Sequence, residues 1–385
     1  MNSWDFWDTL GARRFMRDEV HWRTREGKAD PWGFEYANVI PIQENVGKVR
    51  PDDLIVSDYG DGTPRWAEFV SSLLLKFGLK NRAVVTPGGK YEGTVWASLP
   101  SRPAIHTGDN QKADVDSANA HGIKGVLSAL SPLSESEQYL VGKGFPNLAR
   151  VCREARLTTY SADYRGIELL QTGYNFPVLF LASIVLNREF PTETLLMSAR
   201  DCFMWLELMQ ALFGRGVYWY TSVIARTNAG PNYHRYIQSL GPDPVLVDIS
   251  GSGNSFMALP QYKHILMYKP THGRREVPCM VSSSDCWRLE QANTAPHEKC
   301  VGVDDDLKPV FVNKSKTDFC TEPCTLTAVN AFRVAIGAMK HYDLSSELNT
   351  PSELCKEVMS HLMHQYIKFK EAVEPLRLLA IRDDQ

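Results

Sequence analysis

The sequence predicts an α/β protein with two domains and a helical C-terminal extension, and two observations carry this prediction. In the first third of the chain, short apolar runs typical of strands alternate with stretches that have helical spacing of apolar residues. Such alternation is typical of a parallel sheet covered by helices. From about Thr325 onward the spacing is helical throughout. We expect a first domain at 1–130, a linker at 131–150, a second α/β domain at 151–325 and C-terminal helices at 326–385.

The individual elements are expected from apolar spacing and from the residues that end helices and strands. In the first domain, strands are expected at Asn2–Trp7, Asp53–Ser57, Ala83–Thr86 and Ala104–Thr107, and helices at Trp66–Phe77 and Lys112–Ala120. In the second domain, strands are expected at Thr194–Met197, Val217–Thr221 and Pro244–Asp248, and helices at Phe176–Leu186 and Phe203–Phe213. The C-terminal helices are expected at Ala328–His341 and Ser352–Val373. The segment Leu130–Gly144 is rich in Ser, Leu and Gly, as is typical of a linker.

Length, charge and composition exclude several classes of function. A chain of 385 residues, 43% of them hydrophobic, can bury a sizeable core. A formal net charge of −3 argues against a general nucleic-acid or acidic-membrane binder, since both need a basic surface. The first residues lack the basic region and apolar run of a signal peptide. The longest apolar stretch, Phe176–Leu186, is shorter than the ~20 residues of a membrane span, so we expect a soluble, cytoplasmic protein with reduced cysteines.

Five side chains in the first 125 residues occur in the order that a phosphoaspartyl-type site requires. Asp5 follows a predicted strand, where its carboxylate can attack phosphorus. Ser57 ends a second strand and can donate its hydroxyl to a phosphoryl oxygen, and Lys90 can neutralise charge on both. Asp109 and Asp114 end and follow a third strand, and their hard oxygens suit Mg²⁺. Together they can hold one phosphoryl group and one divalent cation.

This ordered set resembles the haloacid dehalogenase superfamily over about residues 1–128. The stretches WDFWDTL, LIVSDY, KYEG and HTGDNQKADVDSANAHGI are similar to its four motifs, in order. The resemblance implies a Rossmann-like parallel sheet and a Mg²⁺-dependent hydrolase that passes through an aspartyl-phosphate. It assigns Asp5 as nucleophile, Ser57 as the phosphate hydroxyl, Lys90 as the charge-balancing lysine, and Asp5, Asp109 and Asp114 as metal ligands. The implied substrate is a small sugar phosphate or nucleotide.

The chain departs from the family pattern at two places. Phosphatases of the superfamily carry a second Asp two residues after the nucleophile as general acid and base, whereas this chain has Trp7, which cannot transfer a proton to a leaving oxygen. Asp8 follows at once and is the remaining candidate for that role. Only about fifty residues separate Asp5 from Ser57, so we expect little or no cap and an open site.

A Gly/Ser-rich turn after the strand Pro244–Asp248 is the second candidate site. Successive backbone N–H groups in such a turn can bind an anion. The segment is similar to the phosphate loop of type I phosphoribosyltransferases, and this resemblance implies that Asp248 faces a ribose and that Ser252, Gly253 and Ser255 face a phosphate. A tight turn with no ligand is an equally good interpretation.

Two further stretches, LLMSARDCF and YWYTSVIAR, resemble the second half of two-domain proteins from bacterial polysaccharide clusters. Arg200 and Arg226 in these stretches can bind phosphate, or can form structural ion pairs with Asp201 or Asp248. The sequence therefore leaves two rivals to the hydrolase: a phosphoribosyl- or nucleotide-sugar-type transferase that uses the second domain, and a non-catalytic binding or assembly module.

Weaker signals are interpreted structurally. Among Cys and His residues between Cys279 and Cys324, only Cys320 and Cys324 have zinc-type spacing, so free thiols are expected there. His106 and His121, which flank the fourth motif, are expected to be packing or surface residues.

Overall fold

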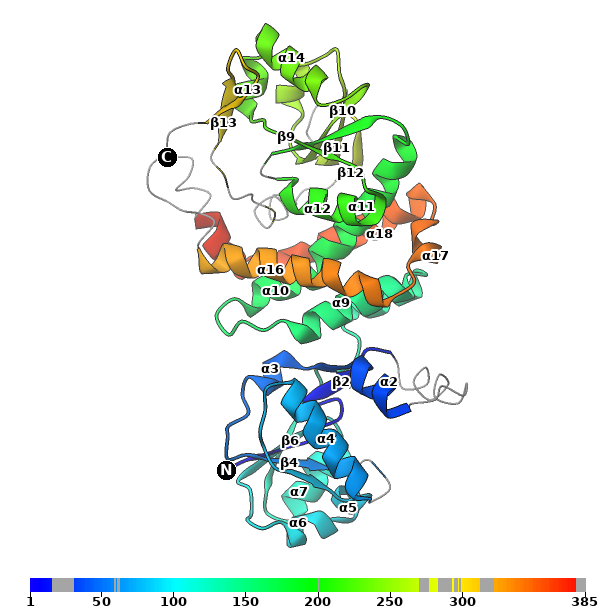
Figure 1. Ribbon diagram of the computed structural model, residues 1–385, viewed down its shortest axis with the longest axis vertical. Helices are drawn as coiled ribbons and strands as arrows, with labels where there is room; N and C mark the ends of the chain where they lie inside the picture. The colour runs from blue at the N-terminus through cyan, green and yellow to red at the C-terminus, as the bar shows by residue number, and fades with distance from the viewer. Residues whose placement is uncertain are drawn as a thin grey trace. The chain divides into compact units, whose positions relative to one another are not determined.

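The computed structural model describes residues 1–15, 31–58, 60, 63–199, 201–269, 277–282, 293, 297, 299–311 and 322–378. These form two compact units (Figure 1). Unit 1 comprises Met1–Leu133 with Leu157–Tyr160, and unit 2 comprises Ser134–Arg156 with Ser161–Gln385. The fold is mixed α/β with two parallel sheets, as the sequence predicts.

The sheet of unit 1 has five parallel strands in the order β5-β4-β1-β6-β7. Their bounds are Ser3–Trp4 (β1), Leu54–Ser57 (β4), Ala83–Val85 (β5), Ile105–Gly108 (β6) and Lys124–Leu127 (β7). The first four confirm predicted strands, and β7 was not predicted. The order runs outward from β1 to β4 and β5 and then reverses to β6 and β7. The reversal therefore lies between β1 and β6.

Helices cover this sheet. The amphipathic helix α4 (Pro64–Lys76) buries Phe69, Val70, Leu73 and Leu74 against β1 and β4 residues, which confirms the predicted helix. The shorter helices are α5 (Gly89–Glu92), α6 (Thr94–Ser98), the π-helix η1 (Gln111–Asp116) and α7 (Ser117–Ala120). The last two together occupy the predicted helix 112–120.

The insertion between β1 and β4 contributes a small antiparallel pair. It contains β2 (Gly11–Arg13), α2 (Pro31–Asn38), β3 (Val39–Pro41) and α3 (Gln43–Val46). Val39 and Val46 pack into the same cluster as Phe6 and Leu10, so the described part of the insertion belongs to the core of unit 1. Residues 16–30 lie outside the described residues, and the openness of the site stays a prediction.

The sheet of unit 2 also has five parallel strands, in the order β12-β11-β10-β8-β9. Their bounds are Thr194–Ser198 (β8), Val217–Trp219 (β9), Pro244–Ser250 (β10), Lys263–Lys269 (β11) and Cys279–Ser282 (β12). The first three confirm predicted strands. Here the strand order reverses between β8 and β10. A small antiparallel pair is formed by β13 (Cys300–Val303) and β14 (Pro309–Phe311).

The segment 131–150, where a linker is expected, contains the boundary between the two units at Leu133 and Ser134, but helices begin directly after it. Ser134 and Glu137 form a capping box that starts α8 (Glu135–Gly142), and Glu137 also accepts a hydrogen bond from Arg156 at 2.7 Å. Glu135 and Glu137 lie in the first turn of this helix, where the positive end of the helix dipole stabilises their negative charge. The next helix, α9, spans Pro146–Thr158.

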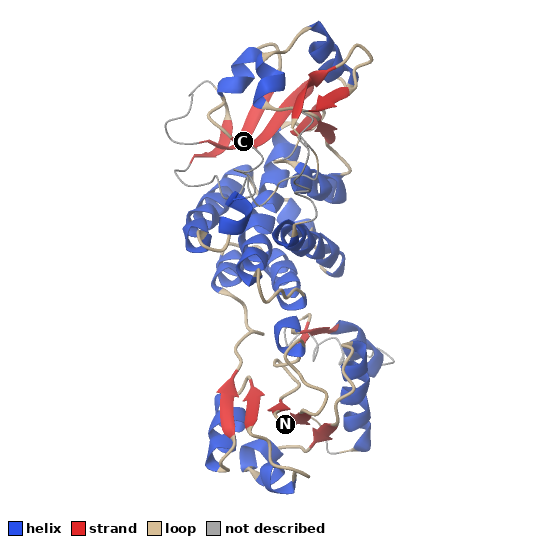
Figure 2. Cartoon of the chain, turned by 90° about the vertical axis from the view of Figure 1, so that its left-hand side faces the viewer, coloured by secondary structure: helices blue, strands red, loops and turns tan. Residues whose placement is uncertain are grey.

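The C-terminal segment is helical, as the sequence predicts, and its helices belong to unit 2. Phe332 of α16 (Pro323–Ala338) and Val358 of α18 (Ser352–His364) pack in one cluster with residues of α11 (Phe176–Glu189) and α12 (Phe203–Phe213). Figure 2 shows that most helices of unit 2 lie on one side of its strands. The apolar faces of the last helices bury surface that the sheet and α11 leave uncovered, so they complete the core of unit 2.

The remaining short helices of unit 2 are α10 (Arg165–Leu170), η2 (Gln171–Asn175), α13 (Val223–Thr227), α14 (Pro231–Ser239), η3 (Asn254–Ala258), η4 (Met339–His341), α17 (Ser345–Leu348) and η5 (Gln365–Phe369). The first two run directly into α11. The resulting helical stretch Arg165–Glu189 has 25 residues and is apolar enough to cross a membrane, which corrects the expectation of a shorter apolar segment. However, 94% of its apolar window is buried inside unit 2, as in a core helix.

Candidate active site

The predicted site residues lie at the edge of the unit 1 sheet where the strand order reverses. Asp5 follows β1, and Asp109 follows β6, which is paired with β1 on one side. Ser57 is the last residue of β4, which is paired with β1 on the other side, and it is 1% exposed. Carboxyl ends of parallel strands meet at one edge, and a reversal of order opens a crevice there. The sheet therefore brings groups from three separate stretches of sequence to one place.

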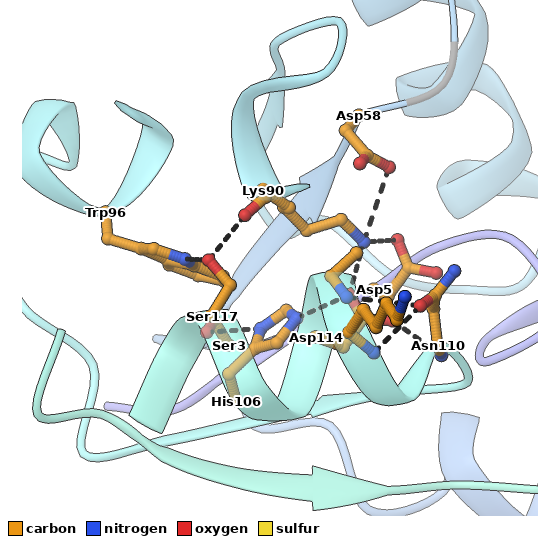
Figure 3. Close-up of polar contacts among 11 residues, drawn as sticks. Ser3, Asp5, Asp58, Lys90, Trp96, His106, Asn110, Asp114 and Ser117 are labelled. Carbon is orange, nitrogen blue, oxygen red and sulfur yellow. Dashed lines mark hydrogen bonds and ion pairs between the residues drawn. The ribbon is translucent and has the colours of Figure 1, made fainter. Parts of the chain in front are cut away.

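Lys90 lies at the centre of this site (Figure 3). Its Nζ donates to Asp5 Oδ1 at 2.6 Å and to Asp114 Oδ1 at 2.5 Å, and it lies 3.6 Å from Asp58 Oδ1. The lysine is 2% exposed, and although burial opposes its charge, these carboxylates raise its pKa. Lys90 is therefore a buried cation that bridges the nucleophile candidate and a metal-ligand candidate.

The backbone of Lys90 is fixed by its neighbours. It belongs to the one-turn helix α5, which begins after Gly88 and ends at Gly93, both in the left-handed region with φ of 67° and 79°. Ser117 Oγ donates to the Lys90 carbonyl at 2.5 Å, and Trp96 Nε1 donates to Ser117 Oγ at 2.9 Å. Glycine adopts such φ values without strain, so the chain can change direction at Gly88 and again at Gly93, on either side of Lys90.

Asp114 is held by the π-helix η1. The Asn110 side chain accepts from Lys112 N and Ala113 N at the start of the helix, and Asn110 N donates to Asp114 Oδ2 at 2.9 Å. The wide turn of a π-helix is frequent at functional sites. The Asp114 carboxylate lies directly over Gly108. A Cβ atom added at Gly108 would lie 2.1 Å from Asp114 Cγ, so only glycine leaves room for the carboxylate.

His106 is a site residue that sequence reasoning missed. It is fully buried on β6, with Nε2 3.1 Å from Asp114 Oδ1 and Nδ1 2.8 Å from Ser3 Oγ. Burial lowers the pKa of His106, which favours the neutral ring. A neutral ring can donate from Nε2 to Asp114 while Ser3 donates to Nδ1, so the histidine orients the carboxylate. The sequence signal was weak, since a lone histidine in a strand is most often a packing residue.

Three carboxylates are arranged so that they can hold a metal ion. Asp5, Asp109 and Asp114 each offer an oxygen within 4.8 Å of the others; Asp5 and Asp114 are buried, and Asp109 is exposed at the rim. Although the residue is exposed, its carboxylate is partly removed from water, and this desolvation, followed by the charges of Asp8 and Asp114, raises the pKa of Asp109 to about 6. Burial likewise raises the pKa of Asp5, against the charge of Lys90. For Asp114, burial is outweighed by His106 and Lys90, which lower its pKa to about 2.

Asp8 and Trp7 occupy different environments. Trp7 is a core residue, 7% exposed, with its ring edge-on to Phe6 and with Arg13 4.1 Å from its centroid. Asp8 is half-buried, adopts a left-handed φ of 55°, and accepts a hydrogen bond from Ser131 Oγ at 2.6 Å. Its charge also acts on the pKa of Asp109. Asp8 therefore lies close enough to the site to influence its ionisation, whereas Trp7 packs in the core.

The candidate residues of unit 2 are arranged differently. Asp248 is 3% exposed and forms an ion pair with Arg226 at 2.8 Å, which is one of the two interpretations that the sequence left open. Ser252 is exposed, Gly253 has a left-handed φ of 79°, and Ser255 is half-buried at the start of η3. Whether these residues meet a phosphate or a ribose stays a prediction at this point. Arg200 lies outside the described residues.

The cysteine-rich stretch shows no metal-binding group among the described residues. The group of Asp5, Asp109 and Asp114 is the one potential metal site found in them. Cys300 Sγ donates to Gly302 O at 3.2 Å, and Cys324 packs in a different apolar cluster. Cys286 and Cys320 lie outside the described residues. His121 is exposed, as the sequence predicts.

No family model matches the chain, and no curated protein matches it.

Proposed function

We propose that unit 1 is a Mg²⁺-dependent phosphohydrolase of the haloacid dehalogenase type, which acts through an aspartyl-phosphate on Asp5. The observation that carries the proposal is the position of Lys90, whose ammonium lies between Asp5 and Asp114 at the reversal of strand order, with Asp109 alongside. A carboxylate can attack an anionic phosphoryl group only where positive charge offsets the repulsion. The buried lysine supplies part of that charge.

The charge balance of the site supports a divalent cation. Three carboxylates, those of Asp5, Asp58 and Asp114, lie within 3.6 Å of the Lys90 ammonium, and the carboxylate of Asp109 lies near those of Asp5 and Asp114. Removing a carboxylate from water without compensating charge is costly, which is why the pKa values of the buried Asp5 and the partly desolvated Asp109 are raised. Oxygen ligands of this kind are those that Mg²⁺ prefers. Bound at Asp5, Asp109 and Asp114, Mg²⁺ would neutralise charge on the phosphoryl oxygens.

The chain's own groups account for the two steps of the reaction. Asp5 forms a bond to phosphorus while the bond from phosphorus to the leaving oxygen breaks, and Lys90 stabilises the added negative charge. Ser57, at the end of β4, would donate to a phosphoryl oxygen. Water then attacks the aspartyl-phosphate, which releases inorganic phosphate and restores the carboxylate. Asp8, rather than Trp7, is the group that would exchange protons with the leaving oxygen and the water.

The proposal extends to the substrate and the location. A small phosphorylated molecule, such as a sugar phosphate or a nucleotide, fits a site built to neutralise one phosphoryl group. The buried free thiols at Cys152, Cys202 and Cys300 suit a reducing compartment, so we place the protein in the cytoplasm.

The direct test is hydrolysis of p-nitrophenyl phosphate by the full chain with Mg²⁺. Asp5→Asn keeps the size of the side chain but removes the nucleophile, and we expect a loss of turnover of at least roughly a hundredfold. Asp52→Asn is the matched control, because Asp52 is an exposed carboxylate with 67% of its side chain accessible. The proposal fails if wild-type turnover is absent, or if it survives Asp5→Asn. Activity that survives Asp5→Asn but is lost in Asp248→Asn would instead indicate the transferase.

A further inference from the structure

The carboxyl edge of the unit 2 sheet carries a second set of groups that the proposed hydrolase does not use. Its strand order reverses between β8 and β10, so a crevice is expected where these two strands end. β8 ends at Ser198, its neighbour β9 ends at Trp219, and β10 runs past Asp248 to Ser250. Three adjacent strands therefore deliver polar side chains to one edge.

The groups lie on the same face of the sheet. Side chains alternate between faces along a strand, so residues two apart share a face. Leu196 and Leu246 are paired neighbours and pack in the same apolar cluster as Trp219. Ser198 and Asp248 lie two residues further along their strands, and Ser198 is paired with Trp219. Ser198, Trp219 and Asp248 are thus neighbours on one face, at its carboxyl end.

Three buried polar atoms at this edge have no partner within the described part of the chain. These atoms are the Ser198 hydroxyl, the Trp219 indole nitrogen and the Nε of Arg226, the arginine that pairs with Asp248. Ser198 is 1% exposed, Trp219 0% and Arg226 7%. A buried polar group without a hydrogen bond costs about 1–3 kcal/mol, so three together at one edge need an explanation.

Arg226 is held rigidly at this place. Its Nη1 donates to Asp248 Oδ2 at 2.8 Å, and its guanidinium carbon lies 4.7 Å above the centre of the Phe256 ring and 5.9 Å from that of Trp219. Phe256 belongs to η3, which follows the glycine-rich loop after β10. The arginine therefore lies between the end of β10 and the element that follows the loop, with its Nε still available.

The loop itself adds backbone donors. Gly251 and Gly253 have φ values of 151° and 79°, and a Cβ at Gly253 would lie 2.5 Å from Val277 Cγ2, so the backbone course requires glycine. Among the described residues, no acceptor receives the N–H groups of Gly251, Ser252 or Gly253. Successive free N–H groups in such a turn form a concavity that suits an anion.

We propose that this edge of unit 2 binds an oxyanion, the phosphoryl group of a small molecule, through Ser198, Trp219, Arg226 and the Gly251–Gly253 loop. The indole N–H and the arginine Nε can only donate, and so can the backbone N–H groups, so the ligand must be an acceptor. The guanidinium favours a charged acceptor over a neutral one. This site is independent of the proposed hydrolase, because it lies in the other unit and needs no metal.

The test measures binding of inorganic phosphate to the full chain by titration calorimetry in EDTA. Without a divalent cation, the carboxylates around Lys90 repel phosphate, so the signal reports unit 2. We expect saturable binding that weakens about tenfold or more in Ser198→Ala and in Trp219→Phe, each of which removes one donor. Ser198→Ala removes a hydroxyl that serves no internal bond among the described residues, so it should unfold at the wild-type urea concentration. Trp219→Phe also shrinks a fully buried core side chain, so it should unfold at a lower urea concentration, and its binding is measured under conditions in which it is folded. Ser360→Ala, in α18, and Lys90→Met, in unit 1, are controls that should bind phosphate as the wild type does.

Several results would overturn the proposal. One is the absence of saturable phosphate binding in EDTA. Another is wild-type affinity in both Ser198→Ala and Trp219→Phe, particularly if Ser198→Ala is less stable than the wild type, since the hydroxyl would then be bonded to ordered water that is part of the fold. Loss of binding in Lys90→Met would assign the phosphate to unit 1 instead. None of these results depends on whether p-nitrophenyl phosphate is hydrolysed.

Discussion

At the scale of single residues, the site in unit 1 depends on side chains that hold other side chains. Lys90 bridges Asp5 and Asp114, and His106 contacts the same oxygen of Asp114 as Lys90 does. A neutral ring that receives a hydrogen bond from Ser3 has one remaining N–H, which fixes the carboxylate it donates to. His106 therefore acts through Asp114, and its removal should affect metal binding first.

His106→Asn should weaken Mg²⁺ binding by about tenfold to a hundredfold, because such supporting bonds orient metal ligands. The Mg²⁺ concentration that gives half-maximal hydrolysis should rise accordingly. His106→Gln, whose longer side chain can bring an amide N–H to the position of the distal Nε2, should restore part of the affinity. His121→Asn is the control, since His121 is exposed. A His106→Asn variant with an unchanged Mg²⁺ requirement would show that the histidine only fills space.

Asp53 is expected to contribute stability that depends on pH. It accepts hydrogen bonds from Asn2 N, Trp4 Nε1 and Arg50 N, at 2.7, 3.0 and 3.1 Å. Burial alone would raise the pKa of Asp53, but these bonds outweigh it and lower the pKa. The charged form is thus favoured by folding, so the stabilisation is present above the ordinary pKa of an aspartate and is lost as the pH falls below it.

Asp53→Asn should therefore lower the free energy of unfolding of unit 1 by about 1–2 kcal/mol at pH 7, and by less at pH 3. Urea unfolding at both pH values measures the difference. The exposed Asp52→Asn serves for comparison and should change little at either pH. An equal loss at both pH values would contradict the ionic origin of the effect.

At the scale of elements, the site depends on how η1 leaves β6. The carboxylate of Asp114 lies over Gly108, and no side chain fits between them. Gly108→Ala should push η1 outward, weaken Mg²⁺ binding by at least about tenfold and destabilise unit 1 by about 1–3 kcal/mol. Both quantities can be measured on the purified variant by Mg²⁺ titration and urea unfolding.

Gly142→Ala is the matched control for this change. Gly142 is the last residue of α8, and nothing lies within 4 Å of an added Cβ there. Alanine should leave Mg²⁺ binding as it is and should, if anything, stabilise the helix by about 0.5–1 kcal/mol. If Gly108→Ala behaves as this control does, the close approach of Asp114 to Gly108 has no consequence for the site.

At the scale of the whole molecule, the two units should respond separately to ligands and to mutation. Their cores are distinct, and unit 2 includes the last helices. Phe332→Ala removes a fully buried ring from α16, and it should destabilise unit 2 by about 3–5 kcal/mol. Calorimetric scanning should then show one transition at a lower temperature and the transition of unit 1 unchanged.

Mg²⁺ should raise only the transition of unit 1, because a ligand stabilises the unit that binds it. Leu326→Ala, also in α16 but 53% exposed, should leave both transitions in place. A single transition that shifts with both Mg²⁺ and Phe332→Ala would mean that the two units unfold as one.

Much of the fold was predictable because its signals are local. The strands around Trp4, Ile55 and Thr107 are short apolar runs bounded by turn residues, and they occur where expected. The differences have physical causes. The Ser, Leu and Gly content of 130–144 is typical of a linker, but Ser134 and Glu137 form a capping box that starts a helix there. The packing of the last helices into the core of unit 2 was not predictable, because packing partners far apart in sequence leave no local pattern.

By itself, the sequence determined which chemical groups follow which strands: Asp5, Ser57 and Asp109 each come at the end of an apolar run. Only the tertiary structure decided which other groups join them. Parallel strands place their carboxyl ends side by side, so side chains dozens of residues apart meet there, among them Asp58 and the buried His106. In unit 2 the strands converge in the same way: Asp248 pairs with Arg226, and the unpaired donors of Ser198 and Trp219 lie on neighbouring strands. The order of the strands decides which side chains become neighbours, and no local sequence pattern encodes that order.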